Sequence, residues 1–144
     1  MVRVTALAAA FALTSSGAFA AATPKFTADC NGSETIQVNS GPIKTVAYAL
    51  RNVTIDLPAK SWCRGLCSED ETRDIADVSS TPVKLTDVDA GPIVRHTTID
   101  LKSGAFSNYL RITTKGGAAA LDVISQVAAT CVPVVATTNL VRVR

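Results

Sequence analysis

Cys63 and Cys67 are the residues whose type and spacing could carry chemistry, within the stretch KSWCRGLCSEDE at residues 60–71. Two cysteines this close can form a redox centre, a haem anchor, part of a metal site or a structural disulfide. A thioredoxin-type centre has two residues between its cysteines, and covalent haem attachment needs a histidine where Ser68 stands. A zinc site would need all four cysteines as thiolates, because His96 is the only histidine. We therefore interpret the pair as a disulfide-closed loop.

The N-terminal sequence predicts export. Residues 1–20 read MVRVTALAAAFALTSSGAFA, in which Arg3 precedes an apolar run and the last three residues fit the A-x-A cleavage rule. The apolar run is shorter than the roughly 20 residues that cross a bilayer. We expect cleavage between Ala20 and Ala21, which leaves one periplasmic or secreted domain over residues 21–144.

Four cysteines in an oxidising compartment most simply form two disulfides, for which three connectivities exist. Gly65 allows a tight turn between Cys63 and Cys67 that brings the two within bonding distance. We favour Cys63–Cys67 together with Cys30–Cys131, because the short loop closes readily during oxidation. The crossed pairings remain as alternatives.

Trp62 is the only tryptophan, and it has two interpretations. In the favoured one it packs against the cystine or closes one end of the sheet core, with its N–H donating to a carbonyl. In the other it is an exposed anchor that grips a partner together with the acidic run Glu69, Asp70 and Glu71. These four residues are the candidate interaction site.

Catalytic motifs are missing from the sequence. No G-x-S-x-G, P-loop, G-x-G-x-x-G or H-E-x-x-H occurs, and a serine triad would need His96, which is predicted on a solvent-facing strand position. We expect no catalytic residue, no cofactor and no metal site. The remaining catalytic hypothesis is a hydrolase with paired aspartates, drawn from Asp56, Asp87, Asp89 and Asp100 at strand ends and turns.

Alternation with period two predicts that the chain is built from strands. Residues 46–50 and 53–57 both alternate, and the phase slips at Arg51-Asn52, which predicts a bulge or a tight turn. Residues 93–101 place apolar side chains on one face, interrupted by Arg95. Weaker strands are predicted at 83–88 and 106–113, and a last edge strand at 139–144.

Turn signals separate these runs, and one segment is ambiguous. The signals are Asn31-Gly32, Ser40-Gly41-Pro42, Ala90-Gly91-Pro92, Ser103-Gly104 and Gly116-Gly117. Residues 118–129 fit either a helix or a strand, and their valines and all-β context favour a strand. The fold predicted is all-β, a single antiparallel sandwich or small barrel-like domain stapled by two disulfides.

The charge and hydropathy of the sequence limit the classes of partner that we expect the protein to bind. The formal net charge is +2, without a cluster of Lys and Arg, which argues against a nucleic-acid surface. The apolar stretch 118–136 contains Asp122 and Pro133, so we expect no membrane span in the mature chain. The expected partner is an unknown small ligand, a glycan or an envelope protein, with a structural envelope role as the alternative.

Several short motifs together resemble a group of small exported alphaproteobacterial proteins of unassigned function. A phenylalanine precedes the first cysteine, an I-D-L ends a strand, a W-C-x-x-x-C follows, and a last cysteine lies near the C-terminus. Here these are Phe26 with Cys30, Ile55-Asp56-Leu57, Trp62 to Cys67, and Cys131. The resemblance implies export and disulfides, and it implies no activity.

Overall fold

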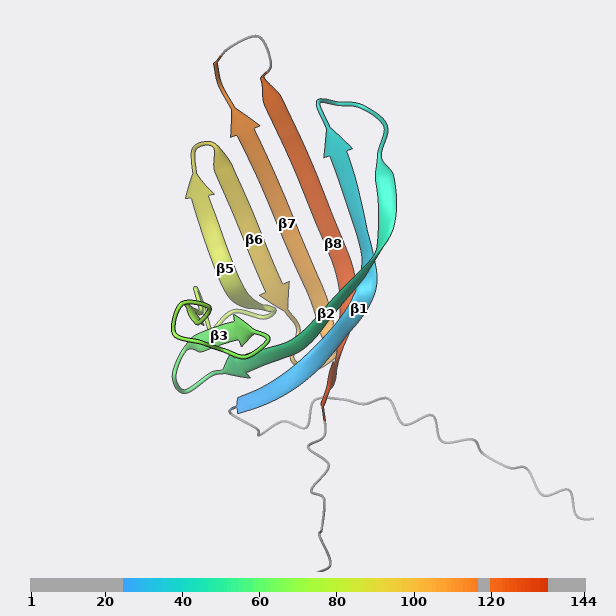
Figure 1. Cartoon of the computed structure of the whole chain (residues 1–144). Helices are drawn as coiled ribbons and strands as arrows, with labels where there is room; N and C mark the ends of the chain where they lie inside the picture. The colour runs from blue at the N-terminus through green and yellow to red at the C-terminus, as the bar shows by residue number, and fades with distance from the viewer. Residues whose placement is uncertain (1–24, 117–119, 135–144) are drawn as a thin grey trace, which may run out of the picture.

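The computed structural model describes residues 25–116 and 120–134, which form one eight-stranded antiparallel sheet (Figure 1). The predicted signal sequence, its cleavage between Ala20 and Ala21, and the predicted strand at 139–144 lie outside the described residues. The strands are β1 (Lys25–Val38), β2 (Lys44–Asp56), β3 (Ser61–Arg64), β4 (Arg73–Asp74), β5 (Val83–Ala90), β6 (Ile93–Ile99), β7 (Ala105–Thr114) and β8 (Leu121–Pro133).

The sheet is curled into a nearly closed barrel. Its strand order is β4-β3-β2-β1-β8-β7-β6-β5, so β4 and β5 form the two edges. Past β4, Asp77 and Lys84 exchange two backbone hydrogen bonds of 3.0 Å, which link the two edges at one end. This arrangement confirms the all-β prediction in its barrel-like form. The segment left ambiguous by its sequence is a strand, β8, as its valines favoured.

The strand register defines an inner face, which is the side that carries the core. Directly opposite residues of neighbouring strands point to the same side of a sheet, so rows of inner residues run across the strands. Ile99, Phe106 and Ala129 form one such row, and Thr97, Asn108 and Val127 form the next. The buried apolar residues of the described chain are Ala28, Cys30, Val53, Ile55, Trp62, Cys63, Ile75, Val83, Leu85, Ile99, Phe106, Val127 and Cys131.

Both predicted disulfides are present. Cys30 and Cys131 lie directly opposite each other on β1 and β8, with their Cα atoms 3.9 Å apart, and both are buried. Cys63 and Cys67 have their Cα atoms 5.2 Å apart across a turn. Gly65 in this turn has a φ of 70°, the conformation that its midpoint position predicted. No cysteine is left free.

The predicted phase slip in β2 is a bulge. Ala28 pairs with Val53 and Cys30 pairs with Leu50, so β2 carries one residue more than β1 between these pairs. Asp29 fills the gap: its carboxylate accepts the Asn52 N–H at 2.9 Å and the Arg51 guanidinium at 3.0 Å. Both bonds lower the pKa of Asp29 below its ordinary value, and the bond from the Asn52 N–H has the larger effect. The bulge keeps Leu50 and Val53 both on the inner face.

The predicted turn at Asn31-Gly32 is wrong. Both residues lie inside β1, which continues from Lys25 to Val38. A Cβ on Gly32 would lie 2.1 Å from the carbonyl oxygen of Ala128 and 2.5 Å from the Cα of Ala129. The glycine therefore marks a close approach of β1 to β8, and not a reversal of the chain.

His96 lies on the outer face, as predicted. It is exposed, its Nδ1 atom lies 2.6 Å from Oδ1 of Asp87, and its ring stacks on Tyr109. We expect His96→Ala to change the free energy of unfolding by no more than about 0.5 kcal/mol, because exposed positions make small contributions. Urea unfolding followed by circular dichroism measures this, and a loss several times larger would show that the strand phase is misassigned.

Candidate functional site

Arg95 is a charged residue on the inner face of the barrel. It pairs with Leu110 of β7 on one side and with Val88 of β5 on the other. The residues two positions away on β6, Ile93 and Thr97, share this face, and Thr97 is fully buried. The arginine that interrupts the apolar pattern of β6 in the sequence is therefore turned into the barrel.

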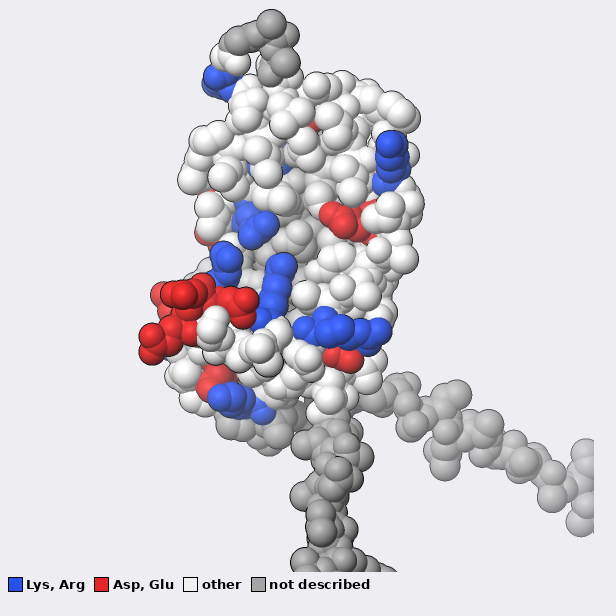
Figure 2. Space-filling view, viewed as in Figure 1, with Lys and Arg blue, Asp and Glu red and all other residues white. Residues whose placement is uncertain are grey.

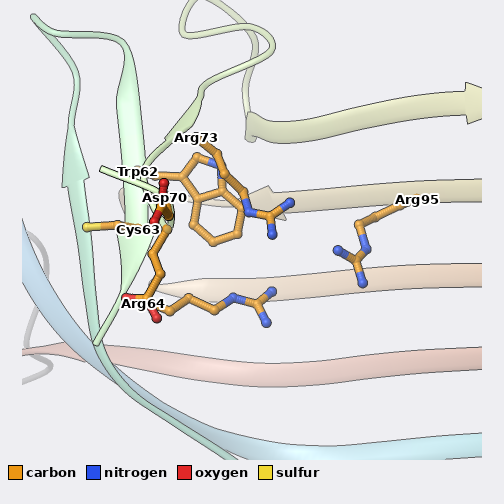
Figure 3. Close-up of a pocket in the computed structure, with 7 residues that line it drawn as sticks. Trp62, Cys63, Arg64, Asp70, Arg73 and Arg95 are labelled. Carbon is orange, nitrogen blue, oxygen red and sulfur yellow. The ribbon is translucent and has the colours of Figure 1, made fainter. Parts of the chain in front are cut away.

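The short strands β3 and β4 bring two more arginines to the same region. Arg64 pairs with the buried Val53 on β2, and Arg73 pairs with the buried Trp62. Because paired residues point to one side of a sheet, both arginines face inward from the end of their strands. The close-up shows the guanidinium groups of Arg64, Arg73 and Arg95 turned toward a common space (Figure 3).

These arginines belong to a pocket of about 210 Å³, which we call the arginine pocket. It opens to solvent between the β3–β4 segment and the inner face of β6 (Figure 3). Its position at a strand-lined opening of a barrel is a common place for a ligand. The lining residues are Trp62, Cys63, Arg64, Asp70, Glu71, Arg73 and Arg95.

The positive charges of the pocket are not neutralised by ion pairs. Within residues 25–116 and 120–134, no carboxylate lies within 4.0 Å of the guanidinium nitrogens of Arg64, Arg73 or Arg95. Removal of water around the Arg64 guanidinium lowers its pKa, the nearby Tyr48 opposes that shift, and the charges of Arg95 and Arg73 lower the pKa further. Such repulsion is relieved when an anion binds between like charges.

Two residues that line the pocket each have a buried nitrogen without a hydrogen-bond partner in the described chain. Nε1 of Trp62 and Nε of Arg95 are the buried side-chain nitrogens in the described chain that make no hydrogen bond. Trp62 is only 3 % exposed, and the Arg64 guanidinium lies 5.3 Å from its ring centroid. A buried donor without a partner costs free energy, so these two nitrogens are exceptions to the usual pairing of buried polar groups.

The acidic loop borders the same pocket. Asp70 and Glu71 contribute to its lining, and Glu69 is exposed next to them. Figure 2 shows acidic side chains gathered over the β3–β4 loop, beside basic side chains in the middle of this face. The two carboxylates reduce the net positive charge of the pocket without pairing with its arginines.

The structure decides between the packing and the exposed-anchor interpretations of Trp62. Its indole is buried in the core cluster, as the packing interpretation predicted, so it is not an exposed anchor. The predicted hydrogen bond from its N–H to a carbonyl is wrong, since Nε1 has no partner among the described residues. Arg64, Arg73 and Arg95 are site residues that were not predicted from the sequence. The interruption of the β6 face by Arg95 was the one available signal.

The aspartates of the hydrolase hypothesis lie apart from the arginine pocket. Asp56 pairs with Lys25, and Asp87 contacts Lys84 and His96 on the outer face. Asp100 accepts backbone N–H groups of a turn, which lower its pKa. In the part of the chain that the structure describes, no three His, Cys, Asp or Glu side chains gather as a metal site would require.

Comparison with known proteins identifies no relative: no family model, curated protein or solved structure matches the chain. The resemblance to small exported proteins therefore remains an expectation from the sequence. Two intramolecular disulfides indicate an oxidising compartment, such as the periplasm or the cell exterior. Among the described residues there is no helix of the length and hydropathy that crossing a bilayer demands.

Proposed function

We propose that this protein is a non-catalytic, exported binding domain whose arginine pocket holds the negatively charged group of a ligand. The observation that carries the proposal is the convergence of Arg64, Arg73 and Arg95 on one pocket, with no ion pair to any of them from the residues that the structure describes. The predicted signal sequence and the two disulfides support the exported location in this proposal.

The donors of the pocket suit a carboxylate or a phosphate. A guanidinium presents several N–H groups in one plane and forms paired, charge-assisted hydrogen bonds with such groups. Trp62 and Arg95, which both line the pocket, each also have a buried nitrogen without a hydrogen-bond partner among the described residues. A bound anion would reduce the repulsion among the guanidinium groups.

The pocket contains its own reporter, because Trp62 is the only tryptophan of the chain. We expect sodium phosphate and sodium acetate, titrated at constant ionic strength against chloride, to change the tryptophan fluorescence saturably. Arg95→Gln should weaken this binding about tenfold or more, since a hydrogen bond to a charged group contributes roughly 1.5–3 kcal/mol. Fluorescence titration of protein purified from the exported fraction makes the measurement.

Arg111→Gln is the matched control. Arg111 lies on the outer face, where its guanidinium bonds both carboxylate oxygens of Asp122 at 2.9 Å. This variant should bind the probe anions as the unmodified protein does. A response that does not saturate, or that Arg95→Gln and Arg111→Gln change equally, would reject the arginine pocket as an anion site.

A further inference from the structure

Apolar side chains on the inner face remain exposed toward the open end of the barrel. This end carries the β1–β2, β5–β6 and β7–β8 connections (Figure 1). The register places two rows there, which we call the upper inner face. One row is Ile93, Ile112, Val123 and Val38, and the next is Val88, Arg95, Leu110, Ser125 and Ile36.

Several apolar side chains of the upper inner face are exposed to solvent. Ile93 and Val38 are each 45 % exposed, and Val88 is 39 % exposed. Leu121, which pairs with Thr114 beyond the first row, is 40 % exposed. The buried core occupies the other end of the barrel, around Phe106 and the Cys30–Cys131 disulfide. The sheet thus continues past its packed core as a partly uncovered apolar surface.

The upper inner face is continuous with the arginine pocket through Arg95. This residue pairs with Val88 and Leu110 of the same face, and its guanidinium also lines the pocket. From Leu110 to Thr114, the apolar surface extends for roughly 14 Å along β7. A cationic pocket therefore adjoins one end of an extended apolar surface.

Resting on the function proposed above, we propose that the ligand is a monomeric anionic amphiphile. Its carboxylate head lies in the arginine pocket, and its unbranched hydrocarbon tail lies along the upper inner face. The head complements the unpaired guanidinium groups, and the tail covers apolar side chains that now contact water.

The carboxylates around the pocket favour a head with a single negative charge. Asp70 and Glu71 line the pocket. Each would repel a second charge on the head. The inward-facing Thr97 donates to Asn108 at 2.8 Å, so these two polar groups need no partner from the tail.

A chain-length series tests the tail. Acetate, octanoate and dodecanoate, each kept below its micelle concentration, are titrated while the fluorescence of Trp62 is followed. We expect the affinity to rise with length, approaching about fourfold for each methylene that becomes fully buried. Dodecyl maltoside, which has the same tail and an uncharged head, should bind at least tenfold more weakly than dodecanoate.

Ile93→Gln and Val132→Gln form a matched pair of variants. Both side chains are exposed, Ile93 on the upper inner face and Val132 opposite Asp29 at the other end of the sheet. Ile93→Gln should weaken the binding of dodecanoate at least threefold and leave the binding of acetate unchanged. Val132→Gln should change the affinity for neither ligand. Circular dichroism melts of both variants establish that each is folded.

The outcomes distinguish this inference from the function on which it rests. Arginine-dependent binding of acetate with no gain from octanoate to dodecanoate would reject the amphiphile and retain the anion site. Loss of all arginine-dependent binding would reject both. Concentration-dependent dimerisation abolished by Ile93→Gln, or binding to phosphatidylglycerol vesicles without binding of monomeric dodecanoate, would assign the apolar face to another occupant and overturn the proposal.

Discussion

Replacing both Cys30 and Cys131 with alanine should lower the melting temperature by more than about 15 °C. The bridge spans a sequence separation of 101 residues, and the chain-entropy relation gives roughly 4.7 kcal/mol for a loop of this size. Both side chains lie in the core, so their truncation also removes buried contacts. Differential scanning calorimetry of the oxidised proteins provides the measurement.

The double replacement of Cys63 and Cys67 is the internal comparison. This bridge has a sequence separation of 4, for which the same relation gives only about 2 kcal/mol. Chemical reduction of the unmodified protein opens both bridges, so it should also lower the melting temperature strongly. Equal melting temperatures for the two double variants, or an unchanged melt after reduction, would show that the long bridge does not constrain the unfolded chain as proposed.

The strands could be predicted because each one shows its own alternation of apolar residues in the sequence. In β2 the alternation of apolar residues is interrupted at Arg51-Asn52, and the structure has its bulge there. A bulge keeps both halves of a strand facing one core, so the phase slip in the sequence is its direct consequence. The same local reasoning failed at Asn31-Gly32, because a glycine required for close strand approach looks identical to a glycine required for a turn.

The candidate site was predictable only in part, because its residues meet through long-range pairing. Arg95 could be recognised as a charge on an otherwise apolar strand face. Arg64 and Arg73 stand in strands of four and two residues, too short to show any alternation. Their inward direction follows from pairing with Val53 and Trp62, which no local pattern reveals.

Trp62 illustrates how a general rule about buried donors can fail at one residue. A buried indole usually has a partner for its N–H, and that rule favoured a carbonyl acceptor. The structure buries the ring and leaves Nε1 without one. Exceptions to this rule need an explanation, and under the function proposed above the missing acceptor is related to the neighbouring anion site.

Gly32→Ala should destabilise the protein by about 1–3 kcal/mol, a loss of roughly 5–15 °C in melting temperature. The added Cβ would meet backbone atoms of Ala128 and Ala129 well inside contact distance, so β8 would have to move away from β1. Backbone cannot rotate aside as a flexible side chain can. The restriction of the unfolded chain by alanine acts in the opposite direction, but it contributes only about 0.4–1 kcal/mol.

Ser33→Ala is the control for this substitution. Ser33 follows Gly32 on β1, pairs with Ala128 of β8, and is exposed. Its replacement should leave the melting temperature within about 2 °C of the unmodified protein, because it alters a surface side chain only. If thermal melts gave Gly32→Ala and Ser33→Ala the same melting temperature, this would show that β1 and β8 do not approach each other at Gly32 as closely as in the structure. Because the Cys30–Cys131 bridge joins the same two strands two residues away, a destabilised Gly32→Ala protein should retain that disulfide and fail by loosening of the β1–β8 pairing toward the open end.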